Sequence, residues 1–171
     1  MKRAGLYVLA LSVMLALPPS GAEATVLARA MSLETTTSKA ERIVYGTVDD
    51  VRVGIDESGM PATWVTFVVA RTLKGRADAR VTIKQLGNSA ATSGDAIARI
   101  PGLPRYTPGE ELVVFLRAGS ERGFTSPIGF ERGVYRVSTK GDRRAARAGT
   151  TGEDVHIDRL LARIAELVAG H

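Results

Sequence analysis

The chain has 171 residues, of which 23 are Lys or Arg and 18 are Asp or Glu, and its formal net charge is +5 at pH 7. It contains no cysteine, which excludes disulfide bonds and thiolate metal sites, so packing must hold the fold together. The modest positive charge is compatible with an anionic lipid, glycan or protein partner, and equally with solubility alone.

The N-terminal residues have the order of regions that is typical of a secretion signal. Lys2 and Arg3 precede an apolar run over residues 6–17, and Ala22-Glu23-Ala24 supplies the small residues of a cleavage site. The run is shorter than the roughly 20 residues that span a membrane. We therefore expect residues 1–24 to be a cleaved signal peptide, with cleavage after Ala24 or, alternatively, after Ala22. The mature protein is expected to be soluble, periplasmic or secreted, without a transmembrane segment, and export argues against nucleic acid as a partner.

The first predicted elements of the mature chain are a short helix and a long strand. Ser32 is a suitable N-cap for a helix that reaches Ala40. Residues 42–48 and 51–55 are rich in β-branched and aromatic side chains, which favour strands. Gly46 and the pair Asp49-Asp50 interrupt the pattern, so we expect one strand that bends or bulges.

Further strand patterns follow through the middle of the chain. Residues 63–73 and 79–84 alternate as strands do, whereas residues 111–117 form a continuous apolar run typical of a strand buried on both faces. Residues 124–130 and 133–138 supply one or two final strands. The stretch 87–109, rich in Gly, Ala, Ser and Pro, is expected to be a long loop that Ile97, Ile100 and Leu103 hold against the body.

The C-terminal part is predicted to be a linker and a helix. Residues 141–152 are rich in Gly, Ala and Arg and are interpreted as a flexible linker. In residues 153–171 the apolar positions form one helical stripe, so this segment is expected to pack on the β domain of residues 25–140. The predicted fold is mainly β: a small antiparallel barrel of OB-like or Greek-key type, or a sandwich, with a C-terminal amphipathic helix.

Several short motifs also carry a resemblance to known proteins over residues 32–138. They are Ser32-Leu33-Glu34, Ala40, Ile43-Val44-x-Gly46-x-Val48, Leu73-Lys74-Gly75, Pro101-Gly102-Leu103-Pro104, Pro108-Gly109-Glu110-Glu111, Val114-Phe115-Leu116, Ile128-Gly129 and Gly133-x-Tyr135-Arg136-Val137. In this order they resemble a group of uncharacterised exported bacterial β-proteins, which implies no particular activity. The plan of a strand that ends in Leu73-Lys74-Gly75, followed by a strand that begins after Gly109-Glu110 and contains Val114-Phe115-Leu116, also resembles netrin-type domains with OB-like barrels. Some of those inhibit metalloproteases through an N-terminal cysteine, which this chain lacks.

No residue pattern indicates a catalytic, cofactor-binding or metal site, so we expect no cofactor and no enzymatic activity. The two histidines, His156 and His171, show no zinc-ligand spacing, and no Gly-x-Ser-x-Gly or phosphate-binding glycine motif occurs. The candidate contacts to a ligand or an anionic surface are Arg105, Tyr106, Arg143, Arg144 and Arg147. Tyr106 could instead cover the end of the barrel, and the three later arginines could be solvated linker residues.

The function that these observations favour is an exported soluble binding or interaction domain of the bacterial cell envelope. Its expected partner is an unknown protein or an anionic envelope component. Two alternatives remain open: a secreted domain that resembles protease inhibitors, and an enzyme without a recognisable motif.

Overall fold

The structure is a computed structural model that describes residues 31–89 and 100–170. The predicted signal peptide and Ile97 therefore lie outside the described residues. The elements are α1 (Leu33–Lys39), β1 (Arg42–Ile55), β2 (Pro61–Lys74), β3 (Arg80–Leu86), β4 (Glu111–Leu116), η1 (Phe130–Gly133), β5 (Val134–Lys140), β6 (Arg143–Ala148), β7 (Asp154–His156) and α2 (Ile157–Ala169). The seven strands form one antiparallel sheet in the order β3-β2-β1-β4-β5-β6-β7, so the mainly β prediction is confirmed.

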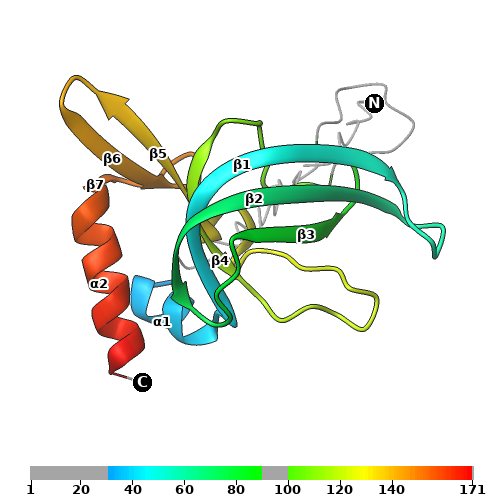
Figure 1. Cartoon of the computed structure of the whole chain (residues 1–171), viewed down its shortest axis with the longest axis horizontal. Helices are drawn as coiled ribbons and strands as arrows, with labels where there is room; N and C mark the ends of the chain where they lie inside the picture. Colours follow the sequence, from blue (N-terminus) through cyan, green and yellow to red (C-terminus); the bar gives the residue numbers. More distant parts are fainter. Residues whose placement is uncertain (1–30, 90–99, 171) are drawn as a thin grey trace, which may run out of the picture.

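The hairpin of β1 and β2 is the longest part of the sheet, and Figure 1 shows both strands as long curved ribbons. The expected interruption is present as register shifts between Tyr45 and Gly46 and between Val48 and Asp50. At Gly46 a Cβ atom would lie 2.3 Å from the carbonyl oxygen of Val68, so only glycine allows β2 to approach this closely. The bulges increase the local twist, which curves the hairpin around the core.

Strand β4 separates two clusters of buried apolar side chains. Leu112, Val114 and Leu116 face a cluster that includes Phe67 of β2, while Val113 and Phe115 face the opposite cluster. Because successive side chains of a strand point to opposite faces, both faces of β4 are buried, as its continuous apolar sequence predicts.

The sheet is not closed into a barrel, although one segment approaches closure. Residues 124–128 run between β3 and β4. One isolated bridge pairs Phe124 with Lys84 of β3, and another pairs Pro127 with Leu116 of β4. Pro127 has no N–H to donate to a ladder, and Gly129 and Phe130 then turn the chain away in left-handed conformations. The described strands therefore form one open antiparallel sheet, which is mainly β as predicted but is not closed into a barrel.

The predicted linker 141–152 is wrong, because it contains β6. This strand pairs with β5 over six residue pairs and with β7 over three. Its sequence has poor intrinsic strand propensity, but the fully buried Ala146 packs under Ile157 and Ile164 of α2. A small side chain is needed there, so packing against the helix outweighs local propensity.

The C-terminal helix packs on the β domain as expected, and within the predicted segment 153–171 it begins at Ile157. Its buried side chains join Val113 and Phe115 of β4 in one cluster. Helix α1 lies beside α2 (Figure 1), and Arg163 of α2 donates a 3.2 Å hydrogen bond to Glu34 of α1. The predicted cap is also present, since the Ser32 side chain accepts from the Thr35 amide. Neither described helix has the length and apolar character needed to cross a membrane.

Candidate functional site

The main candidate site is a pocket of about 300 Å³ beside the free edge of β3. Gln85 and Leu86 at the end of β3 form one part of its wall, and Ile100 and Leu103 of the following loop form another. The remaining lining residues are Phe124, Thr125, Ser126 and Phe130. The walls are mostly apolar with a few polar groups, and the volume is at the lower end of the range typical of small-molecule sites.

Backbone hydrogen bonds fix the part of the wall formed by residues 124–128. The Thr125 amide donates to the Lys84 carbonyl of β3 at 2.8 Å, and the Ile128 amide donates to the Phe115 carbonyl of β4 at 2.8 Å. This segment therefore spans the gap between the two strands. It closes one side of the pocket without becoming a strand itself.

The Phe124 ring is held by a charged group on β3. The Lys84 ammonium lies 4.4 Å from the centre of this ring, and it also donates a 2.9 Å hydrogen bond to Asp56 at the tip of the β1–β2 hairpin. Asp56 also accepts hydrogen bonds from the hydroxyl and amide of Ser58 and from the Met60 amide. These bonds and the bond from Lys84 hold the pKa of Asp56 far below its usual value. The charge on Lys84 is thus balanced by Asp56 next to the pocket wall.

Gln85 is the most deeply buried polar residue of the pocket wall, with 1% of its surface exposed. Its side-chain nitrogen donates a 3.1 Å hydrogen bond to the Pro104 carbonyl, which ties the loop to β3. Because a carbonyl can only accept a hydrogen bond, the amide atom that faces Pro104 must be the nitrogen, and the other amide atom is the oxygen Oε1. Oε1 is buried and has no hydrogen-bond partner in the part of the chain that the structure describes. An unpartnered buried acceptor is costly, and such groups require an explanation.

Phe130 lies at the rim of the pocket in an unfavourable backbone conformation. Its φ is 56°, and it is the only non-glycine residue with positive φ among the described residues. Bulky residues rarely adopt this conformation. The side chain is nevertheless 48% exposed, so its burial does not offset the strain. Backbone strain of this kind is concentrated at functional sites.

Two of the predicted contact residues lie in the loop near the pocket. Arg105 is exposed, and its carbonyl accepts a 2.7 Å hydrogen bond from Arg136. Tyr106 is buried in the core, where its ring meets Phe67 edge to face with 5.7 Å between ring centres. Burial raises the pKa of Tyr106 well above its usual value. Tyr106 is therefore not an exposed contact residue but part of the buried core.

The other three predicted residues lie on β6 instead of a linker. Arg144 donates hydrogen bonds to Glu111 of β4 and to the Tyr45 hydroxyl of β1, and Tyr45 also donates to Glu111. Arg147 contacts Asp154 of β7 at 2.8 Å, while Arg143 is exposed at the hairpin tip. Arg144 and Arg147 thus connect strands through ion pairs. Contact of these arginines with an anionic surface stays a prediction.

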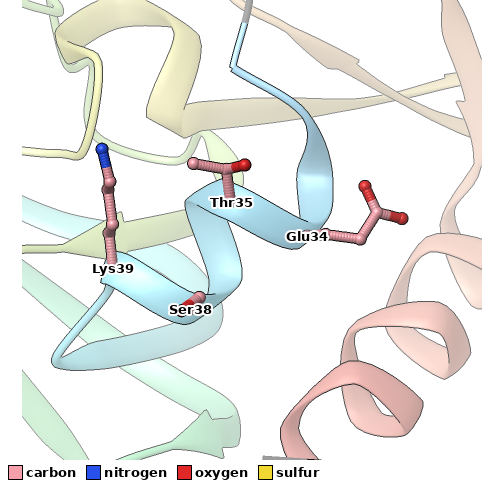
Figure 2. A pocket seen from close by; sticks show the side chains of 4 residues that line it. All are labelled: Glu34, Thr35, Ser38 and Lys39. Atoms are coloured by element: carbon pink, nitrogen blue, oxygen red, sulfur yellow. The ribbon is translucent and has the colours of Figure 1, made fainter.

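A second, shallow depression of about 270 Å³ is formed by Glu34, Thr35, Ser38 and Lys39. Figure 2 shows that all four side chains come from the short helix α1 and that Glu34 and Lys39 extend from opposite sides of it. Glu34 is engaged by Arg163 of α2. The depression lacks converging groups, so it offers no chemistry comparable to that of the pocket at β3.

Among residues 31–89 and 100–170, no group of three or more His, Asp or Glu side chains is placed to hold a metal ion. The sequence interpretation missed the pocket because its residues come from three separate segments. It recognised Leu103 and Ile100 as apolar anchors of the loop, but nothing in the sequence marks Gln85 or Phe130 as their neighbours. No protein-family model matches the chain, and a search of curated proteins finds no match either.

Proposed function

We propose that the protein is an exported, non-enzymatic binding domain of the cell envelope that takes a small apolar ligand into the pocket at the edge of β3. The observation that carries this proposal is the pocket itself, with its mostly apolar walls and the strained, half-exposed Phe130 at its rim. Export is inferred from the order of regions in residues 1–24.

The composition of the pocket wall favours binding over catalysis. None of the eight described residues that line it carries a side chain that ionises near neutral pH, whereas general acid–base catalysis uses such groups. Apolar walls with a few placed polar groups are typical of sites that bind a ligand and fix its orientation.

The test is a titration of the ¹⁵N-labelled mature chain with 3-methylindole, in which NMR measures the change in the backbone amide chemical shifts. We expect saturable binding to the wild type and binding at least several-fold weaker in Phe130→Ala. Val68→Ala is the matched control, because Val68 is 42% exposed and pairs with Arg80 at the opposite end of β3. Absence of saturable binding to the wild type, or equal affinity in Phe130→Ala, would contradict the proposal.

A further inference from the structure

We infer that the pocket selects small, neutral aromatic molecules that carry one N–H or O–H donor, and that Gln85 Oε1 receives this donor. This inference rests on the proposed function, because it concerns the ligand of the same pocket. It is carried by three features of the described part of the wall: an unpartnered acceptor, two aromatic side chains, and the lack of ionisable groups among the eight described lining residues.

The acceptor is fixed in place by its neighbours. The Gln85 nitrogen is held by Pro104 at 3.1 Å, so the amide cannot satisfy Oε1 by exchanging its two ends. Oε1 is buried and has no hydrogen-bond partner among residues 31–89 and 100–170. We take the missing donor to come from a group that enters the pocket, because Gln85 is part of the pocket wall.

The aromatic class of the ligand follows from Phe124 and Phe130. Lys84 and Asp56 hold the first ring from β3 and the hairpin tip, and the left-handed backbone of Phe130 holds the second at the rim. Aromatic rings interact favourably with one another in offset or edge-to-face arrangements. A pocket of about 300 Å³ admits a ligand of one or two rings.

Neutrality follows from the electrostatics of the wall. The eight described lining residues provide no charge to pair with an ionised ligand, and Lys84, which lies against the Phe124 ring, is already paired with Asp56 at 2.9 Å. Burial of an unpaired charge is strongly unfavourable. A carboxylate or an ammonium group on the ring would therefore prevent entry.

The test compares two isomers, 3-methylindole, which has an N–H donor, and 1-methylindole, in which a methyl group replaces it. Both are titrated into the wild type and into Gln85→Met, which has similar size but no amide, with Val68→Ala as control. A single net hydrogen bond contributes roughly 1 kcal/mol, so we expect the wild type to bind 3-methylindole about five- to tenfold more tightly. In Gln85→Met the preference should disappear while binding of 1-methylindole is retained.

The outcomes separate this inference from the proposed function. Equal affinity of the two isomers for the wild type, or a preference that persists in Gln85→Met, would overturn the donor inference and leave the binding function standing. Failure of 3-methylindole to bind at all would overturn both. If Gln85→Met does not fold, Gln85→Leu also removes the acceptor, and a preference for 3-methylindole that persists in that variant would likewise contradict the inference.

Discussion

Lys84 of β3 donates a 2.9 Å hydrogen bond to Asp56, and this ion pair ties the tip of the β1–β2 hairpin to the edge of the sheet. Only 2% of the Asp56 side chain is exposed. The same Lys84 lies against Phe124 in the pocket wall, so the hairpin tip and the candidate site share one charged contact.

We predict that this contact makes the fold sensitive to acid. The pKa of Asp56 is lowered in the folded state, so its stabilising effect is complete above the unfolded-state value of about 4 and is lost as the pH falls below it. Asp56→Asn should melt several degrees lower at pH 7 and should lose less stability than the wild type between pH 5 and pH 3. Thermal melts across this range test the prediction, with Asp50→Asn, an exposed acid paired with Arg52, as control. Parallel acid profiles for wild type and Asp56→Asn would contradict it.

The core of the sheet is predicted to depend on Phe67. This ring is 1% exposed and contacts Tyr106 edge to face. Phe67→Ala should reduce the free energy of unfolding by about 3–5 kcal/mol, the range for a buried aromatic side chain. Urea denaturation measures this change, and a midpoint equal to that of the wild type would show that the two faces of β2 have been assigned incorrectly.

Helix α2 is predicted to contribute to the stability of the same folding unit. Ile164 is fully buried between the helix and the sheet, so Ile164→Ala should cost about 2–5 kcal/mol. Glu166→Gln, on the exposed side of the helix, should change stability by less than about 0.5 kcal/mol. Equal denaturation midpoints for the two variants would indicate that the helix is not docked.

Most strands could be predicted because their apolar side chains alternate or run continuously, as in Val65 to Val69 and Leu112 to Leu116. Strand β6 could not, because its Arg and Ala residues have low strand propensity and are held by pairing with β5 and by the space under α2. The pocket also could not be predicted from the sequence. It depends on the distant contact between Gln85 and Pro104 and on the left-handed conformation of Phe130, and neither has a sequence signal.

Because Arg143 and Arg144 lie on β6 and not in a linker, a prediction about these two arginines follows. Arg144→Gln loses the hydrogen bonds to Glu111 and Tyr45 and should cost about 0.5–1 kcal/mol, a small value because the side chain is 43% exposed. Arg143→Gln, at the exposed hairpin tip, should melt like the wild type. If the two variants melt at the same temperature, the contact between β6 and β4 does not contribute measurably to stability.

Export is predicted to leave a mature chain that begins at Thr25 or, with the alternative cleavage site, at Glu23. Mass spectrometry of the protein expressed with its full N-terminus in a bacterial host measures this start directly. Recovery of the uncleaved chain in the membrane fraction would contradict the signal-peptide interpretation.

The strain at Phe130 allows stability and binding to be separated. Glycine adopts a φ of 56° without penalty, so Phe130→Gly should relieve roughly 1–2 kcal/mol of backbone strain and melt at or above the wild-type temperature. The same variant should bind 3-methylindole at least several-fold more weakly. A clear fall in melting temperature would show that Phe130 is retained for the fold.

The central claim, that the pocket at the edge of β3 is a ligand site, is tested most directly by a crystal structure of the mature chain grown with 3-methylindole. We predict that the ring occupies the space lined by Leu103, Phe124 and Phe130, with its N–H directed at Gln85. An empty pocket, with the ring bound elsewhere or not at all, would contradict the account.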